Sequence, residues 1–113
     1  MVRTVLKMRV REGCERSFEE VWAQAAIEIS GYAGHLGQFL MREQDEPRTY
    51  VIMADWESTR HLDDFEHSPV RQALSAALTP LREFAQKTVL DGVRELDVRE
   101  LDTVGENGRK RQS

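Results

Sequence analysis

Cysteine, long apolar runs and clustered positive charge are all scarce in this sequence. The one cysteine, Cys14, cannot form a disulfide within the chain, and no window approaches the roughly 18 apolar residues that a membrane-spanning helix requires. Lysine and arginine number 16 against 20 aspartates and glutamates, and the cations are scattered along the chain. Because binding to a nucleic-acid backbone needs a concentrated positive face, we expect no nucleic-acid partner. The single cysteine and the lack of a long apolar run lead us to expect a cytoplasmic protein with no membrane partner.

The pattern of apolar residues predicts one domain of the α+β class. Strict alternation indicates strands at Val2–Val10, 34–42, 48–56 and 87–93, and the 113 residues leave no room for a second core of ordinary size. Spacings of three and four indicate a helix from Phe18 to Ile29, with Gly31 as a left-handed cap. Ser58 and Ser68 are expected to cap two further helices. The resulting order, β-α-β-β-α-β, is typical of the ferredoxin-like split βαβ arrangement.

Such a four-stranded antiparallel sheet carries its helices on one face and leaves the other face open. By the parity of each strand, the open face is expected to be strongly apolar, more so than the surface of a monomer usually is. We therefore predict a homodimer formed through the open sheet face. The side chains assigned to this face are Val5, Phe39, Met41, Val51, Met53, Val89 and Val93.

The last part of the sequence differs in character from residues 1–94, which we assign to the domain. Residues 95–113 form a C-terminal extension that begins within a duplicated five-residue stretch, 93–97 and 98–102, and ends without periodicity. We expect a short segment that packs on the partner subunit, followed by a flexible tail.

No motif for a metal, a phosphate or a redox cofactor stands out. The three histidines are not spaced as a set of metal ligands, and the glycines lack the strand-then-helix context of a phosphate loop. Cys14 lies where a helix begins, yet three nearby glutamates oppose formation of its thiolate. The sequence therefore predicts a protein without a bound metal or cofactor.

One strand offers a candidate pocket. Its even-numbered residues end at Trp56, and if they face the helices the indole lies beneath Phe65 and Leu74. An aromatic-walled cavity and a filled core are both compatible with this pattern. A void of a few hundred cubic ångströms beside Trp56 would favour ligand binding. Small side chains on the covering helices are expected to leave that room: Ala25, Ala26, Ala73, Ala76 and Ala77.

Two stretches of this sequence, YVIMADWES at 50–58 and FEHSP at 65–69, resemble the signature of the antibiotic biosynthesis monooxygenase family. The opening strand, the Arg11-Glu12-Gly13 turn and the helix from Phe18 are also similar, so the likeness covers about residues 2–93. It implies a dimeric α/β barrel with a cavity in each subunit between the sheet and the helices. It also implies oxidation of an electron-rich phenol, anthrone or quinol by O2 without metal, flavin or haem.

The resemblance carries over to particular residues. It implies that Trp56 is a cavity wall and a hydrogen-bond donor, whereas Ile52 stands where members that oxidise aromatic polyketides often have an asparagine. Without that polar group, the acid or base is sought among Tyr32 and the three histidines. We predict catalytic roles for Trp56, His67, Tyr32 and His35, and substrate contacts for Phe65, Tyr50, Ile52, Met8 and Leu74.

Three functions remain open at this stage. The first is a cofactor-independent monooxygenase of aromatic polyketide or other secondary-metabolite biosynthesis. The second is a non-redox polyketide cyclase or accessory binding protein on the same scaffold, which the loss of a polar group at Ile52 favours. The third is a structural dimer with a filled core. Degradation of haem is disfavoured, because Phe65 and Ser75 stand where that branch has its tryptophan and histidine.

Overall fold

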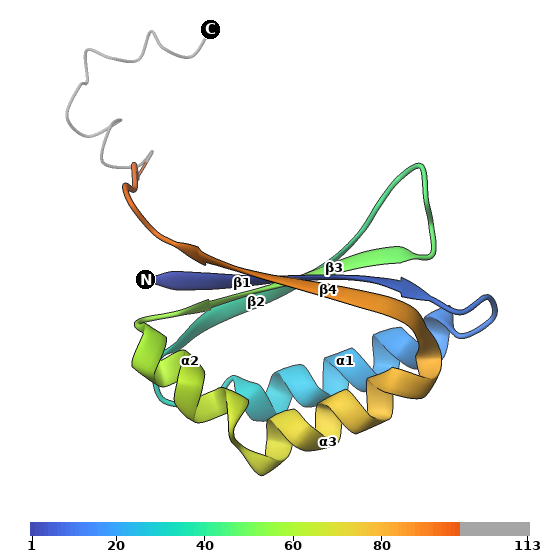
Figure 1. Cartoon of the computed structure of the whole chain (residues 1–113), viewed down its shortest axis with the longest axis horizontal. Helices are drawn as coiled ribbons and strands as arrows, with labels where there is room; N and C mark the ends of the chain where they lie inside the picture. The colour runs from blue at the N-terminus through green and yellow to red at the C-terminus, as the bar shows by residue number, and fades with distance from the viewer. Residues whose placement is uncertain (98–113) are drawn as a thin grey trace, which may run out of the picture.

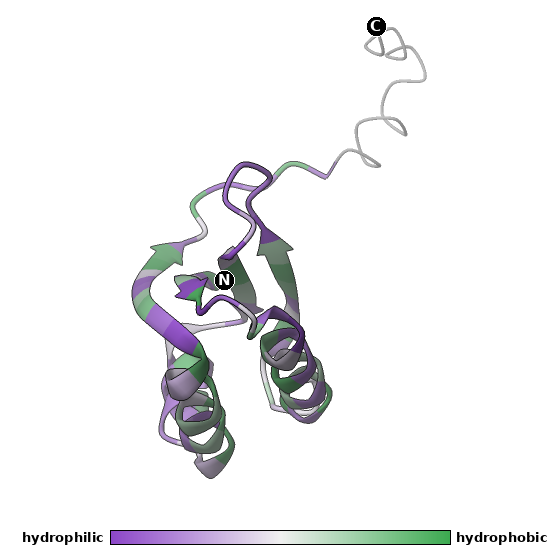
Figure 2. Cartoon of the chain, turned by 90° about the vertical axis from the view of Figure 1, so that its right-hand side faces the viewer, coloured by the Kyte–Doolittle hydropathy of each residue, from purple (hydrophilic) through white to green (hydrophobic). Residues whose placement is uncertain are grey.

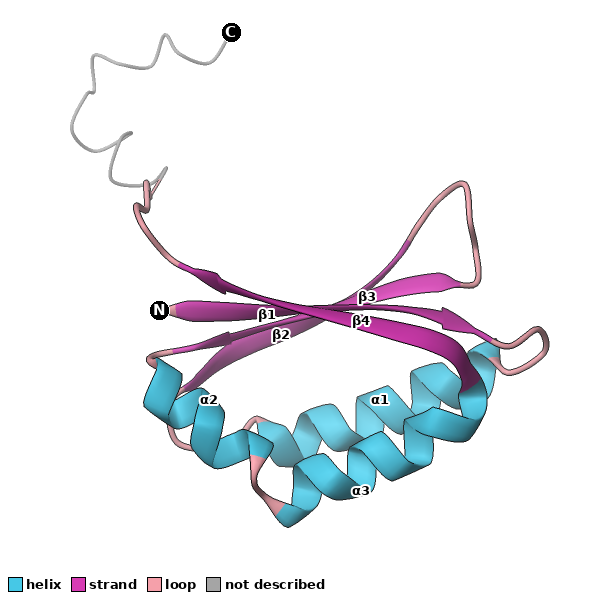
Figure 3. Cartoon of the chain, in the orientation of Figure 1, coloured by secondary structure: helices cyan, strands magenta, loops and turns pink. Residues whose placement is uncertain are grey.

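The computed structural model describes residues 1–97, in which a single sheet carries all its helices on one face (Figure 1; Figure 3). No helix in this part of the chain is long and apolar enough to cross a membrane. Residues 98–113, which include most of the predicted C-terminal extension, lie outside the described part. The elements follow in the order β1 (Val2–Val10), α1 (Glu15–Ile29), β2 (His35–Arg42), β3 (Thr49–Trp56), α2 (Thr59–Glu66), α3 (Pro69–Leu78), η1 (Thr79–Leu81) and β4 (Arg82–Asp91).

The sheet has the strand order β2-β3-β1-β4, and every neighbouring pair is antiparallel. The two central strands pair along their whole length, from Val2 opposite Trp56 to Arg9 opposite Thr49. This confirms the α+β, ferredoxin-like fold. Viewed from its side, the molecule shows the sheet as one layer with the helices gathered below it (Figure 2).

Two predicted helix starts are confirmed. The Ser58 hydroxyl accepts a hydrogen bond of 3.2 Å from the His61 backbone N–H, and the Ser68 hydroxyl accepts one of the same length from the Arg71 N–H. Pro69 then occupies the first turn of α3, where its missing N–H leaves no hydrogen bond unmade. Ser58 thus marks where the chain passes from β3 into the helix layer, and Ser68 marks where α3 begins after α2.

The predicted left-handed cap at Gly31 is wrong, because α1 ends through Ser30 in a right-handed conformation. The left-handed turn comes three residues later, at Gly34, with φ at +81°. There the backbone passes directly under the ring of His61, and a Cβ at this position would lie 2.2 Å from the His61 Cγ atom. Gly34 therefore lets β2 start close beneath α2.

The last strand corrects two predictions. β4 begins at Arg82, five residues before the predicted start. Its register places Val89 opposite Thr4 and Leu90 opposite Arg3, so Val89 points to the helix side of the sheet. Val93 lies beyond the end of the strand. Phe84 and Leu90 occupy the open face where those two valines were predicted, together with the correctly assigned Val5, Phe39, Met41, Val51 and Met53.

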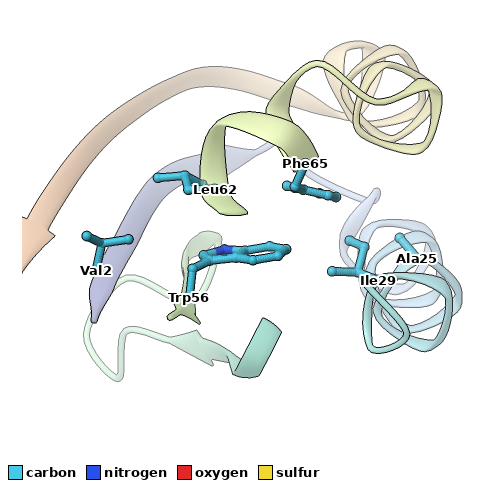
Figure 4. Close-up of a cluster of buried hydrophobic side chains, with 6 residues drawn as sticks. All are labelled: Val2, Ala25, Ile29, Trp56, Leu62 and Phe65. Atoms are coloured by element: carbon cyan, nitrogen blue, oxygen red, sulfur yellow. The ribbon is translucent and has the colours of Figure 1, made fainter. Parts of the chain in front are cut away.

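Between sheet and helices the core divides into two clusters. One cluster lies at the β2–α2 end and is drawn in Figure 4; it consists of Val2, Ala25, Ile29, Trp56, Leu62 and Phe65. The other is closed around the fully buried rings of Phe18 and Tyr50, whose centroids are 4.8 Å apart. Leu74 packs against both clusters. The chain thus has one tightly filled end and one end built around Trp56.

We expect Gly34→Ala to destabilise the protein more than Gly13→Ala. Both glycines have positive φ, which costs an alanine about 1–2 kcal/mol. Only Gly34 adds a collision with the His61 ring, worth a further cost of about 1–3 kcal/mol, because nothing lies within 4 Å of a Cβ at Gly13. Urea unfolding of the two variants measures the difference. Equal losses would show that the approach of α2 to Gly34 is not tight in solution.

Candidate functional site

Trp56 is the last residue of β3, and its side chain is only 1% exposed. The indole stacks on the ring of Phe65 from α2, with centroids 4.9 Å apart and planes 24° apart (Figure 4). His35, paired with Trp56 across the sheet, meets the indole edge-on at 5.0 Å. As the alternation of β3 predicts, the ring lies between the sheet and the helices.

A cavity of about 60 Å³ lies beside this indole. Its walls come from all four strands and from all three α-helices, so it extends across the layer between the sheet and the helices. Apolar side chains form most of its surface near Trp56, and charged side chains from α2, α3 and β4 line the rest. The lining residues are Thr4, Leu6, Ile29, Gln38, Ile52, Ala54, Trp56, Leu62, Phe65, Glu66, Arg71, Leu74, Leu78, Arg82 and Lys87.

The cavity is smaller than the few hundred cubic ångströms that ligand pockets usually have. At 60 Å³ it has room for a few water molecules. The space left by the helical alanines lies elsewhere: Ala25, Ala73 and Ala77 line a separate groove of about 660 Å³ between α1 and α3. A flat aromatic ligand can enter beside Trp56 only if the long side chains of the lining turn aside. The long side chains in question, Gln38, Glu66, Arg71, Arg82 and Lys87, each have several rotatable bonds.

Gln38 supplies a polar group that the sequence analysis missed. It lies on β2 opposite Ala54, which directs its side chain to the same side of the sheet as Trp56. Its amide nitrogen is buried and has no hydrogen-bond partner in the described part of the chain. A buried donor without a partner costs about 1–3 kcal/mol. This group is therefore placed to donate a hydrogen bond to an oxygen atom in the cavity.

The charged part of the lining was also not predicted. Arg71 comes from α3, Arg82 and Lys87 from β4, and Glu66 from the end of α2. Lys87 forms an ion pair with Glu66. Burial lowers the pKa of the Lys87 ammonium, although the carboxylate of Asp63 opposes this. These residues are far apart in sequence and meet only because β4 forms the edge of the sheet next to α2 and α3.

The structure brings four of the predicted site residues together around the cavity: Trp56, Phe65, Ile52 and Leu74. Met8 and Tyr50 are buried in the closed cluster instead. The Tyr50 hydroxyl donates a hydrogen bond of 2.6 Å to Glu19, and burial, reinforced by this carboxylate, raises its pKa despite the nearby Arg42. Both residues therefore act in the structure as core side chains outside the cavity lining.

The other three predicted catalytic residues do not line the cavity. Tyr32 contacts Phe65 edge-on, with ring centroids 5.4 Å apart, and is held behind it. His67 is exposed at the end of α2, where its Nδ1 atom donates a hydrogen bond of 2.8 Å to the Asp63 carbonyl. His35 touches Trp56, and its Nε2 atom is buried without a partner in the described part of the chain. Of the three, His35 alone is in contact with the indole.

Burial lowers the pKa of His35, and the carboxylate of Asp55 only partly offsets this. Asp55 is itself held by Arg3, whose guanidinium makes two hydrogen bonds to it, of 2.6 and 2.9 Å, and keeps its pKa below the usual range. Burial therefore favours the neutral form of the imidazole beside Trp56. Within residues 1–97, no three His, Cys, Asp or Glu side chains come close enough together to bind a metal ion.

Comparison with family models identifies one family, and two further comparisons find related proteins and folds. The family model described as antibiotic biosynthesis monooxygenase matches residues 1–77. A Bacillus subtilis (strain 168) protein, YczJ, is 33% identical over 79 residues, which is 69% of this chain and 83% of that protein. SnoaB, a cofactor-independent oxygenase from Streptomyces nogalater, superposes with a TM-score of 0.76 at 24% identity, over 84% of this chain and 95% of SnoaB. A conserved protein from Methanosarcina mazei Go1 gives a TM-score of 0.77 at 15% identity, over 81% and 92%.

We expect the free energy of unfolding to fall as the pH drops from about 7.5 to about 5.5, in part because of His35. Its folded-state pKa lies below the unfolded value of 6.5, so the unfolded chain binds the proton first and acid favours unfolding. In His35→Gln this contribution disappears, and the fall should be smaller. Urea unfolding at both pH values measures it. An unchanged fall in the variant would contradict burial of His35 against Trp56.

Proposed function

The chain belongs to the antibiotic biosynthesis monooxygenase family, and we propose that it oxidises an electron-rich aromatic compound of the anthrone, phenol or quinol type with O2. The observation that carries this proposal is the buried Trp56 and Phe65 stack that walls a cavity with one unpartnered amide, Gln38. We assign the reaction to aromatic polyketide or other secondary-metabolite biosynthesis. The single cysteine, unable to pair within the chain, is in keeping with the reducing cytoplasm.

The chemistry needs no redox group from the protein. An anthrone loses a proton to give an enolate, which transfers one electron to O2; the resulting carbon radical and superoxide combine into a peroxide. Protonation and loss of water leave a carbonyl group, so that one CH2 and one O2 become one C=O and one H2O. The protein has to remove and return a proton, hold the ring in place and exclude water.

Each of these tasks has a candidate on the cavity wall. Trp56 and Phe65 offer flat faces for a ring, and Ile52 and Leu74 keep its surroundings apolar. Gln38 can donate a hydrogen bond to the oxygen that becomes negative in the enolate, the role that a polar residue at Ile52 would otherwise have. Lys87 and Glu66 line the cavity and can exchange protons with a ligand. Tyr32 and His35 serve in this proposal as supports of Phe65 and Trp56.

The second candidate is a non-redox cyclase or accessory protein that binds a polyketide chain. One observation favours it: Ile52 lines the cavity with a hydrocarbon side chain at the position where the resemblance led us to expect an asparagine. A protein that only folds and holds a polyketide needs walls of the right shape more than a group that stabilises an enolate. The two candidates share the cavity and differ in whether O2 is consumed.

We expect metal-stripped protein to accelerate O2 consumption by an anthrone above the uncatalysed rate, as followed with an oxygen electrode. Trp56→Phe should lower the rate while the protein stays folded, because the two side chains are both flat and apolar. Gln38→Met removes the amide and keeps the length, so kcat should fall about 100-fold. Gln24→Met, on the exposed side of α1, is the matched control and should leave the rate unchanged.

The outcome separates the candidates. Binding of the anthrone without O2 uptake, repeated with a quinol and a phenol, would remove the oxygenase and leave the cyclase or binding protein. A rate that Trp56→Phe and Gln38→Met do not change would show that any oxidation takes place outside this cavity.

The open face of the sheet supports a further part of the proposal, a homodimer. Phe39, Met41, Phe84 and Leu90 are each about half exposed on it, with exposed fractions of 51%, 48%, 46% and 46%. Large apolar side chains exposed in this way on both edge strands, β2 and β4, favour association with a second copy. The same face also carries charged side chains: Arg3 pairs with Asp55, Lys7 with Glu43, and Arg9 with Glu46 and Glu83.

We expect wild-type protein to sediment as a dimer and Phe39→Glu as a monomer, because the new carboxylate would be buried between two sheets. Ile27→Glu is the matched control: Ile27 is 71% exposed, on α1 and away from the open face, so this variant should remain dimeric. Sedimentation velocity measures both. A monomeric wild type, or dissociation of both variants, would refute a dimer through the sheet.

A further inference from the structure

The cavity carries a local charge opposite to that of the chain. The whole sequence has a net charge of −4, yet three cations, Arg71, Arg82 and Lys87, line the cavity against one carboxylate, Glu66. Glu66 is paired with Lys87, and Asp63 acts on the same lysine from outside the lining. The two guanidiniums have no carboxylate within ion-pair distance in the described part of the chain.

Arg82 is the more constrained of the two. It is half-buried, and its Nη1 atom makes only a weak contact of 3.9 Å to the Met8 sulfur. Burial lowers the pKa of this guanidinium, and the positive charge of Arg71 lowers it further. Two neighbouring cations that are each partly removed from water oppose folding unless something compensates them. Within residues 1–97 no acidic side chain does so for Arg82.

A β-bulge sets the direction of Arg82. The pairing of β1 and β4 runs in regular steps as far as Arg9 opposite Phe84, and one more step would place Glu83 opposite Val10. The register shifts there, and Arg82 takes that place instead. Val10 is fully buried on the helix side of the sheet, so the shift turns a cation to the cavity side in place of a carboxylate. Glu83 pairs outside the cavity, with Arg48 and Arg9.

From these observations we infer that Arg82 and Arg71 bind an anionic oxygen group of the ligand whose ring lies against Trp56. The inference rests on the proposed function for the aromatic nature of the ligand and goes beyond it in naming its charge. Guanidinium groups match carboxylates and ring oxyanions alike, because both offer oxygen acceptors to a planar donor. The ligand is thus an aromatic acid: either a carboxylate substituent or an ionised hydroxyl on the ring meets the two arginines.

Two matched pairs of small probes distinguish these sources. The first pair is 2-naphthoate and 2-naphthamide, which have the same shape and differ in charge. The second pair is 2-hydroxy-1,4-naphthoquinone, ionised at neutral pH, and its methyl ether. Binding is measured by equilibrium dialysis without turnover. We expect the anion of at least one pair to bind about tenfold more tightly than its neutral partner, the strength of a charge-assisted hydrogen bond.

Arginine variants test whether the preference comes from this part of the lining. Arg82→Gln should remove most of the tenfold preference and Arg71→Gln part of it, while the affinity for the neutral probes stays the same. Arg60→Gln changes an exposed arginine of α2 outside the lining and is the matched control. Circular dichroism shows which variants are folded; if Arg82→Gln unfolds, Arg82→Lys, which keeps the charge but loses the planar fork, takes its place and should weaken the preference.

The inference fails if neither anion is preferred, if no probe binds at millimolar concentration, or if the preference survives in Arg82→Gln. Its failure is distinct from that of the proposed function. Anion preference that depends on Arg82, without any O2 uptake, would keep this site and remove the oxygenase. O2 uptake that depends on Trp56, without a role for Arg82, would do the reverse.

Discussion

The contact between Trp56 and Phe65 is the constraint on which the rest of the site depends. It joins the end of β3 to the short helix α2, two elements separated by only Glu57 and Ser58. The Ser58 cap fixes where α2 starts, and Gly34 lets the helix approach the sheet, so the two rings can stack at van der Waals distance. Loss of this stack would remove the aromatic wall of the cavity. It would also remove a contact that orients α2, the helix that carries Glu66.

Much of the fold could be predicted because its signals are local. Alternation in β1 and β3, the three-and-four spacing of α1 and the two serine caps each lie within a few residues, and local geometry decides them. The wrong predictions for β4 depended on partners elsewhere in the chain. The start of β4, with its sequence Arg82-Glu83-Phe84-Ala85-Gln86, has no clear alternation, and only pairing with β1 holds it in the sheet. The alternation along β4 was predicted correctly from residue 87 to residue 91. Which of the two alternating sets of side chains faces the helices is decided by the pairing of β4 with β1.

The candidate site divides in the same way. Trp56, Phe65, Ile52 and Leu74 could be found because they share one strand or lie on the helices that must cover it. Gln38, Arg82 and Lys87 could not, since their part in the lining comes from strands on either side of the central pair. His67 shows the opposite error, because it was predicted as a catalytic residue from the motif around it. It lies at the C-terminal end of α2, where its side chain is exposed to solvent. Proximity in sequence located the aromatic wall, whereas Gln38, Arg82 and Lys87 reach the cavity through the pairing of the strands.

The separation of the core into a closed end and a Trp56 end bears on how such a chain can change over evolutionary time. Phe18, Tyr50 and Met8 hold the layers together without touching the cavity, so mutations around the indole can be sampled while the scaffold persists. Leu74 packs against both clusters, and Ile52 and Leu78 of the closed cluster also line the cavity, so replacement of any of these three would affect both ends. Relatives with different chemistries can thus share one inherited framework, with divergence concentrated on the lining and restrained at the few side chains that the two ends share.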